Sequence, residues 1–290
     1  MLITLNGRLV KKEDARISIF DHGLLYGDGV FEGIRSYNCL VFKLKDHIDR
    51  LYASAHGISL KIPMTKNEMQ SAILTTLKAN KLKDAYIRVV VTRGEGDLGL
   101  DPKNCSRPSI FIITDKIALY PRELYKKGLT IITVPTRRNI PEALNPQIKS
   151  LNYLNNILGK IEANNAGVPE AVMLDQNGFV TECTGDNIFM IKEKQLLTPS
   201  VHLGILNGIT RLAVLGLAPK IGLKAQEGFI TRFDLFTSNE VFLTGTAAEI
   251  ISVVKMDGRL IGDGKVGPFT LKLTGEFKKL TKKEGVRYAL

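Results

Sequence analysis

The amino-acid sequence predicts an α+β fold organised in two domains. Both halves contain short segments with strand-like patterns and longer segments with helical periodicity, and no repeat or low-complexity tract interrupts them. The segment ALYPRELYKKG, with a proline, a charge cluster and weak periodicity, separates the halves. We therefore expect a small N-terminal domain at 1–117, a linker at 118–127 and a larger C-terminal domain at 128–290.

The N-terminal domain is expected to begin with strands and to continue with two helices. Strand patterns occur in LITLNGRLV, ARISIF and VFEGIRSYNCLVFKL. Apolar residues at helical spacing predict helices over residues 44–56 and 67–81. Two further strands, AYIRVVVTRG and SIFIITD, follow them. These elements predict an α+β domain.

The C-terminal domain is expected to be a meander of strands with three helices. A strand in LTIITVPTRR leads into NIPEALNPQIKS, whose prolines predict irregular backbone. Helices are predicted over 150–164 and about 208–221, and near the C-terminus where apolar residues form a helical stripe. The remaining strands are expected in EAVMLD, FVTEC, NIFMIK, EVFLTG and IISVVKMDGRLI.

The net charge of +11 over 290 residues raises the possibility of nucleic-acid binding. The C-terminal lysines fall largely outside the apolar stripe, and aromatic residues do not interleave with them, so a solvated basic face is the preferred interpretation. Three cysteines and four scattered histidines lack the spacing of metal ligands, so we expect no metal. No apolar run is long enough for a membrane span and no signal-peptide pattern opens the chain, which predicts a cytoplasmic protein.

The stretch Gly94–Gly99 matches the glycine pattern of dinucleotide-binding proteins. Such a motif must open a helix that receives the pyrophosphate and crosses to a parallel strand. Here only LDPKNCSRP separates Gly99 from the next strand, and its two prolines leave no room for a crossover helix. We therefore interpret the stretch as a loop between two antiparallel strands, and Asp115 as a strand-end residue.

Three features outside that loop indicate chemistry. Lys149 follows the proline-rich approach and precedes an apolar-faced helix, so its ammonium is expected to point inward, where a desolvated lysine becomes a nucleophile. The first turn of the helix at NGITR offers free amides for a phosphate, although for this motif taken alone a well-capped helix is the preferred interpretation. Glu182 lies in a strand where a buried carboxylate would need a cationic partner. Together these features predict a pyridoxal phosphate site.

Six segments, in this order, resemble the class IV aminotransferases, the fold-type IV pyridoxal phosphate enzymes: DHGLLYGDGVFEGIR, YIRVVVTRG, KSLNYLNN, TECTGDNIF, NGITR and TGTAAEI. The resemblance covers about residues 3–285 and is strongest to the branched-chain amino acid aminotransferases. It implies a smaller N-terminal α/β domain, a larger C-terminal domain with a β-barrel-like sheet, and a homodimer or higher homo-oligomer whose active sites are shared between subunits.

The resemblance also implies which residues bind the cofactor. Lys149 would bind pyridoxal 5′-phosphate covalently and move the proton between Cα and C4′. Glu182 would pair with the pyridine nitrogen, and Tyr153 would hydrogen-bond the ring hydroxyl. The phosphate would be held by Arg50, the amides of Ile209 and Thr210, and Thr246.

The substrate site follows from the same resemblance. Tyr86 and the amides of Thr246 and Ala247 would hold the α-carboxylate, and Arg88 would meet the γ-carboxylate of glutamate. The remaining residues expected to line the pocket are Tyr26, Phe31, Arg35 and Tyr120. Leu98 and Leu100, in the glycine loop, would reach the neighbouring subunit's site and cover a branched aliphatic side chain.

The implied reaction is ping-pong transamination of leucine, isoleucine or valine with 2-oxoglutarate, giving the branched-chain 2-oxo acid and glutamate. A D-amino acid transaminase or an aminodeoxychorismate lyase of the same fold would share Lys149 and Glu182. The motifs FEGIR and AYIR favour the branched-chain L-amino acids. A basic nucleic-acid-binding protein is the alternative from another class.

Overall fold

The computed structural model describes residues 1–116 and 119–290. The chain divides into two compact units: Met1–Ile117 with Ile148–Asn152 and Thr281–Leu290, and Ala118–Gln147 with Tyr153–Leu280. The predicted boundary between residues 117 and 118 lies outside the described part of the chain. Neither unit is continuous in sequence, because the segments 148–152 and 281–290 belong to the first.

The first unit is built on a seven-stranded antiparallel sheet in the order β16-β4-β3-β5-β6-β1-β2. Its strands are β1 (Leu2–Leu5), β2 (Arg8–Lys11), β3 (Gly29–Tyr37), β4 (Leu40–Phe42), β5 (Ala85–Thr92), β6 (Ser109–Asp115) and β16 (Gly285–Arg287). The β-branched residues of β3, β5 and β6 suit this pleated, half-buried surface.

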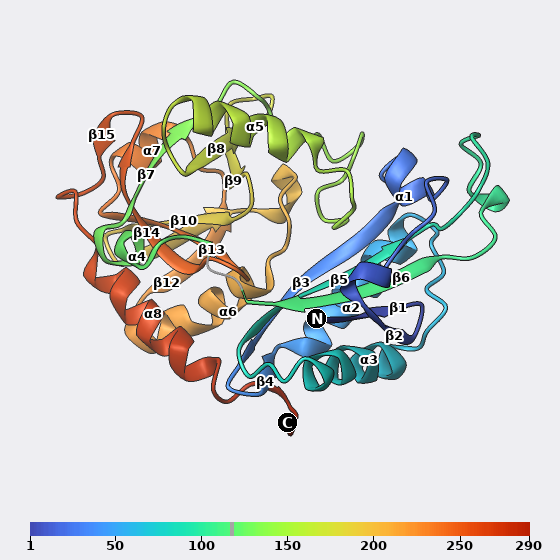
Figure 1. Ribbon diagram of the computed structural model, residues 1–290. Helices are drawn as coiled ribbons and strands as arrows, with labels where there is room; N and C mark the ends of the chain where they lie inside the picture. Colours follow the sequence, from blue (N-terminus) through green and yellow to red (C-terminus); the bar gives the residue numbers. More distant parts are fainter. Residues whose placement is uncertain (117–118) are drawn as a thin grey trace. The chain divides into compact units, whose positions relative to one another are not determined.

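Two helices, α2 (Leu44–Gly57) and α3 (Lys66–Ala79), pack on one face of this sheet (Figure 1). That face carries alternate residues of the central strands, such as Ile34, Ile87 and Ile112, which are at most 1% exposed. A capping box between Thr65 and Glu68 fixes the start of α3. A one-turn helix, α1 (His22–Leu25), precedes β3.

The second unit contains a nine-stranded mixed sheet, in which β12-β11-β10-β13-β14-β7-β8-β9 are neighbours and β15 pairs with β14. Its strands are β7 (Leu129–Thr133), β8 (Glu170–Leu174), β9 (Val180–Cys183), β10 (Asn187–Lys192), β11 (Gln195–Pro199), β12 (Lys224–Gly228), β13 (Glu240–Gly245), β14 (Glu249–Met256) and β15 (Arg259–Leu260). The sheet curls until β9, at one end, lies against β10 and β11. This curl confirms the barrel-like sheet that the resemblance implied.

The helices of this unit are α4 (Arg122–Lys127), α5 (Leu154–Asn165), α6 (Ile209–Leu217), α7 (Arg232–Phe236) and α8 (Pro268–Leu280). Helix α5 packs on β8, while α6 packs on β13 and α8 (Figure 1). The buried Leu273 and Phe277 of α8 belong to the stripe predicted for this helix.

Several predicted elements differ from the structure. The strand predicted in ARISIF is wrong: residues 15–20 form no strand, and Ile17 and Ile19 are 40% and 72% exposed. The helix predicted from residue 150 begins at Leu154, because the preceding residues make strand-like contacts described below. The expected linker contains α4, and the short strands β11, β12 and β16 were not predicted.

The loop after β5 confirms the interpretation of the glycine motif. Strands β5 and β6 pair antiparallel from Tyr86 with Asp115 to Thr92 with Ser109. The connection between them contains only one short 3₁₀ turn, at Pro102–Asn104. A Rossmann crossover, with its helix and parallel strand, is therefore excluded at this place.

Within residues 1–116 and 119–290, no helix has the length and apolarity needed to cross a membrane. The same residues contain no group of three or more His, Cys, Asp or Glu side chains placed to hold a metal ion.

Candidate functional site

The predicted site residues fall into two groups, one in each unit. In the first unit, Lys149 is held along the edge of β3. Within β3, only Ser36 and Tyr37 pair with β4, so the edge of β3 at Gly29–Phe31 is left for another segment. Residues 149–151 take that edge: the Phe31 amide donates to the Lys149 carbonyl at 2.9 Å, and the Leu151 amide donates to Gly29 at 2.9 Å.

Helix α2 adds a third attachment to the same segment. The Lys149 amide donates to Ser54 Oγ on α2 at 3.1 Å. The Lys149 side chain is half-buried, and its Nζ lies 4.6 Å from the centre of the Phe31 ring. The backbone of the predicted nucleophile is therefore fixed by a strand and a helix of one unit.

The face of β3 and β5 opposite the helices carries four predicted substrate residues. Strand register places Phe31, Arg35, Tyr86 and Arg88 on this face, because side chains two apart along a strand point the same way and paired residues share a face. Arg88 Cζ lies 4.5 Å from the centre of the Phe31 ring and 5.5 Å from that of Tyr86. Phe31 thus has a cationic group on Lys149 and another on Arg88 as neighbours.

Gly33 makes this arrangement possible. It pairs with Arg88, and a Cβ at residue 33 would lie 2.2 Å from the Tyr86 hydroxyl oxygen. Any larger residue would displace the phenol from its place across β3. The absence of a side chain at Gly33 therefore allows the Tyr86 hydroxyl, predicted to bind the α-carboxylate, to lie where it does.

The opposite face of β3 contributes a buried ion network. Glu32, 0% exposed, accepts hydrogen bonds from Arg50 Nε at 2.6 Å and Arg50 Nη2 at 2.9 Å. His47 Nδ1 lies 2.7 Å from the second Glu32 oxygen. His47 and Arg50 are three apart on α2, so both reach the same carboxylate. The two hydrogen bonds to Glu32 therefore fix the orientation of Arg50, the predicted phosphate ligand.

The charges of this network follow from its geometry. Burial alone would raise the pKa of Glu32, but attraction to Arg50 and His47, with their hydrogen bonds, outweighs it and lowers the pKa to about 2. Burial lowers the pKa of His47, against the partial opposing attraction of Glu32. At neutral pH the ring is neutral and donates its Nδ1 proton to the carboxylate.

The loop after β5 is tied to the segment around α1. The Tyr26 hydroxyl donates to the Leu98 carbonyl at 2.6 Å, and His22 Nε2 lies 2.8 Å from the Asp97 carbonyl. Leu98 and Leu100 are 71% and 79% exposed. The structure thus brings Tyr26 and Leu98 together and leaves two large apolar side chains of the loop uncovered within this chain.

In the second unit, Glu182 on β9 is a buried carboxylate, 5% exposed. Arg138 donates to its Oε1 from Nη2 at 2.8 Å and from Nε at 3.0 Å. The Asn187 side-chain amide and the Leu206 backbone amide donate to Oε2 at 3.0 and 3.1 Å. These donors stabilise the negative charge and fix the orientation of the carboxylate.

Helix α6 presents its N-terminus to the same neighbourhood. Its N-cap is Gly208, and no side chain caps it, so the first amides of the helix have no side-chain acceptor from the cap. A Cβ on Gly208 would lie 2.1 Å from Asn187 Oδ1. Asn187 therefore packs tightly against the start of α6 and also binds Glu182. It connects the helix start predicted to bind the phosphate with the carboxylate predicted to bind the pyridine nitrogen. Ile209 and Thr210 are both buried.

The turn after β13 carries Thr246 and Ala247, both half-buried. A Cβ on Gly245, just before them, would lie 2.0 Å from Asp186 Oδ1. Asp186 also accepts a 3.3 Å hydrogen bond from the hydroxyl of Tyr120. Tyr120 and the start of the Thr246–Ala247 turn therefore approach one buried carboxylate, and the close contact requires glycine at residue 245.

The sequence did not indicate the residues that orient these groups. Arg138 lies in an irregular segment between prolines, and Asn156, which helps to fix it at 3.0 Å, lies on α5. Nothing in their spacing points to Glu182, since Arg138 and Glu182 are 44 positions apart. The pairing of Glu32 with Arg50 was likewise missed, although a charged residue in the apolar alternation of β3 was a usable signal.

Comparisons with known proteins show what this chain is similar to. The family model of amino-transferase class IV matches residues 29–256. A protein of Methanocaldococcus jannaschii, provisionally assigned as a branched-chain-amino-acid aminotransferase, is 54% identical over 287 residues, covering 99% of each chain.

Solved structures are similar over nearly the whole chain. The branched-chain amino acid aminotransferase of Escherichia coli has a TM-score of 0.95 at 33% identity, covering 98% of this chain and 96% of that chain. The branched-chain amino acid aminotransferase of Thermobaculum terrenum, solved in its pyridoxal phosphate form, has a TM-score of 0.87 at 29% identity, covering 97% and 93%.

Proposed function

This chain belongs to the class IV aminotransferases, and we propose that it transfers the amino group of leucine, isoleucine or valine to 2-oxoglutarate. Pyridoxal 5′-phosphate is the cofactor of this reaction class. The products are the branched-chain 2-oxo acid and L-glutamate. The two half-reactions alternate on one site.

One observation carries the substrate assignment: Lys149 shares a sheet face with Phe31, Tyr86 and Arg88. An aromatic ring suits a branched aliphatic side chain, whereas a guanidinium beside it suits the second carboxylate of glutamate. A site that must accept leucine and glutamate in turn needs both surfaces near the reacting lysine.

In each unit, taken by itself, the candidate residues fit the cofactor by their chemistry. The uncapped start of α6, with the amides of Ile209 and Thr210, suits a phosphate, and Thr246 and Arg50 add a hydroxyl and a guanidinium. Glu182, with its charge fixed by Arg138 and Asn187, suits a protonated pyridine nitrogen. We assign the ring hydroxyl to Tyr153. The cofactor, when bound, supplies an electron sink for the pair of electrons left at the substrate Cα.

The protein's own groups then perform the proton transfer. Lys149 Nζ removes the proton from the substrate Cα and returns it on the cofactor side, acting as base and then as acid. Two backbone hydrogen bonds between residues 149–151 and β3, and the bond from the Lys149 amide to Ser54 Oγ, keep its Cα in place during that transfer. Tyr86 and the amides of Thr246 and Ala247 orient the α-carboxylate, while Phe31 excludes water from the side chain.

We also propose a homodimer, or a higher homo-oligomer, with shared sites. Leu98 and Leu100 are more than 70% exposed on a loop whose backbone is fixed by Tyr26 and His22. Large apolar side chains held in the open are typical of a surface that another subunit covers. Tyr26, Arg35 and Tyr120 complete the proposed pocket lining. Location in the cytoplasm stays a prediction.

The cofactor assignment is tested with Lys149→Ala. We expect the purified enzyme to show the visible absorbance of lysine-bound pyridoxal phosphate, and the variant to lose this band and its transamination. Lys83→Ala, which removes an exposed lysine of the same unit, is the control and should retain both. A wild-type protein that stays colourless after addition of the cofactor would refute the assignment.

The substrate is tested by half-reactions on the loaded enzyme, without 2-oxoglutarate. Loss of the band with L-leucine and L-valine, and its recovery with 2-oxoglutarate, is expected. A response to D-alanine alone would replace the branched-chain assignment with a D-amino acid transaminase. Pyruvate released from aminodeoxychorismate, with no amino-group transfer, would replace it with a lyase.

A further inference from the structure

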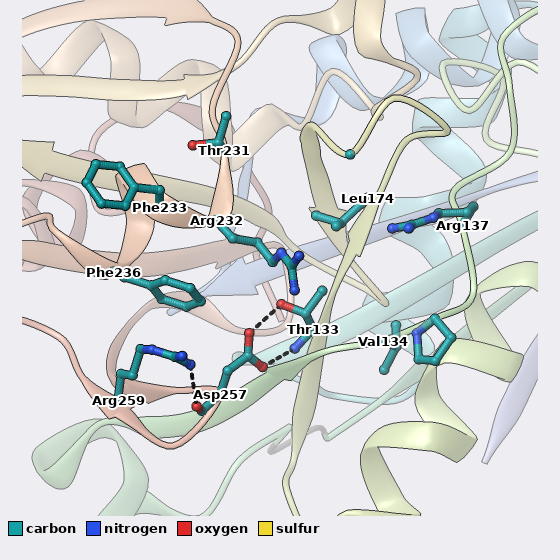
Figure 2. Close-up of a pocket in the computed structure, with 12 residues that line it drawn as sticks. Thr133, Val134, Arg137, Leu174, Thr231, Arg232, Phe233, Phe236, Asp257 and Arg259 are labelled. Atoms are coloured by element: carbon teal, nitrogen blue, oxygen red, sulfur yellow. Dashed lines mark hydrogen bonds between the residues drawn. The ribbon is translucent and has the colours of Figure 1, made fainter.

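A second hollow lies in the second unit, lined by none of the residues assigned above. Its volume is about 730 Å³, and it is bordered by the end of β7, helix α7 and the turn between β14 and β15 (Figure 2). Pockets for small organic ligands are commonly about 300–1,000 Å³. The hollow therefore has the size of a metabolite site.

Its lining carries an excess of positive charge. Three guanidinium groups, of Arg137, Arg232 and Arg259, face one carboxylate, that of Asp257, which leaves two positive charges. The Asp257 oxygens already accept from the Thr133 amide at 2.6 Å and the Thr133 hydroxyl at 2.7 Å. The carboxylate is thus used to connect β7 with the turn after β14.

The arginines differ in what they bind. Arg259 donates to the Asp257 carbonyl at 3.0 Å, and its Cζ lies 4.7 Å from the centre of the Phe236 ring. Among residues 1–116 and 119–290, neither Arg137 nor Arg232 makes a side-chain hydrogen bond or ion pair. Figure 2 shows these two side chains extending into the hollow from opposite sides. Two unpaired guanidiniums directed at one space suit a multiply charged anion with several acceptor oxygens.

An exposed aromatic ring stands beside them. Phe233 follows Arg232 on α7 and is 69% exposed, and Phe236 forms the adjoining wall. A capping box fixes the start of this helix: Thr231 Oγ1 accepts from the Asp234 amide at 3.3 Å, and Asp234 accepts from the Thr231 amide at 2.8 Å. The ring and the guanidinium are therefore presented from one rigid turn.

We propose that this hollow binds a nucleoside monophosphate. The phosphate lies between Arg137 and Arg232, where each planar guanidinium offers paired donors to its oxygens. The base stacks on Phe233, an interaction available to any base because each has a π face. Phosphate and base together explain why unpaired arginines and an exposed phenylalanine meet in one hollow.

The sequence contains no tryptophan, so Phe233→Trp creates a single tryptophan in the hollow that preserves a stacking surface. We expect titration of the cofactor-loaded variant with AMP to quench its fluorescence saturably. Adenosine and inorganic phosphate should each bind at least about tenfold more weakly, since adenosine lacks the phosphate that the arginines bind and inorganic phosphate lacks the base that stacks on the ring.

Arginine variants in the Phe233→Trp background locate the anion. Arg232→Ala and Arg137→Ala should each weaken AMP binding by about tenfold or more, whereas Arg8→Ala, which removes an exposed arginine of the first unit, should not. Calorimetry on the enzyme with Phe233 intact should give the same affinity for AMP as the fluorescence titration.

Three results would overturn the proposal. They are the absence of a saturable response, an equal loss with Arg8→Ala and Arg232→Ala, and inorganic phosphate binding as tightly as AMP. Sedimentation gives a fourth criterion: if Arg232→Ala alone dissociates the assembly, the hollow is a contact between copies of the chain and not a nucleotide site.

Discussion

Glu32 in the first unit and Asp186 in the second are both almost completely buried carboxylates, yet their protonation differs. Burial and neighbouring Glu170 raise the pKa of Asp186 to about 7, whereas the pKa of Glu32 is lowered to about 2. Burial acts in the same direction on both groups. The difference is that Glu32 binds Arg50 in bidentate fashion, while Asp186 has a tyrosine hydroxyl and a second carboxylate nearby. The charged groups around each carboxylate, rather than its depth of burial, therefore determine whether it is protonated.

The largest expected effect comes from removing the charge of Glu32. Glu32→Gln leaves the half-buried Arg50 guanidinium without its counter-charge and should destabilise the protein by about 3–5 kcal/mol. Denaturant unfolding at neutral pH measures the change. Asp49→Asn, which breaks an exposed pair with Lys66, is the matched control and should have little effect. Equal effects of the two variants would contradict the importance of burial in this comparison.

The acid dependence should be dominated by the same network. The folded pKa values of Glu32 and His47 lie below their ordinary values of 4.5 and 6.5, so their contribution to stability is present above those values and is lost as pH falls. For Glu32 the loss extends down to about pH 2 and amounts to about 3 kcal/mol. His47→Gln should flatten the stability curve just below pH 6.5. An unchanged slope there would show that His47 does not contribute.

The smallest expected effect has the opposite sign and comes from Asp186. Its folded pKa of about 7 exceeds the ordinary 3.8, so its contribution is complete below pH 3.8 and is lost as pH rises to 7. Asp186→Asn removes the cost of ionisation, which the pKa shift limits to about 4 kcal/mol at about pH 8. It also weakens the bond to Tyr120 and places amide protons in the tight contact with Gly245, so we expect a net stabilisation of about 1–2 kcal/mol. Denaturant unfolding at that pH measures the gain. Asp263→Asn, at an exposed carboxylate, should not reproduce it.

The elements predicted correctly from the sequence are those whose pattern is repeated over many residues. The helices predicted over 44–56 and 67–81 match α2 and α3 within two residues at each end, and the β5–β6 pairing follows from two apolar β-branched runs. The segment ARISIF alternates equally well, but it finds no strand partner, and Ile19 remains exposed. Alternation creates a strand only where a neighbour supplies the hydrogen bonds.

The site shows the same limit at the level of side chains. Lys149 and Glu182 could be singled out as candidates because each is unusual for its local context. Their partners could not, since Arg138 reaches Glu182 across 44 positions, and Ser54 reaches Lys149 across 95. The start of α5 was misplaced for a related reason: residues 149–151 pair with β3, a contact that helical periodicity does not encode.

The scattered origin of the first unit has a consequence for protein synthesis. The part of this unit that precedes β7 is synthesised before the second unit, yet the edge of β3 receives Ser150 only after β7 has been made, and β4 receives β16 only after α8 has been made. The Tyr288 hydroxyl donates to the Leu82 carbonyl across 206 positions, so this bond also forms only after the second unit has been made. Until then the nascent unit has two unpaired β edges, so chaperone dependence, or truncation between α8 and β16, should affect this unit most.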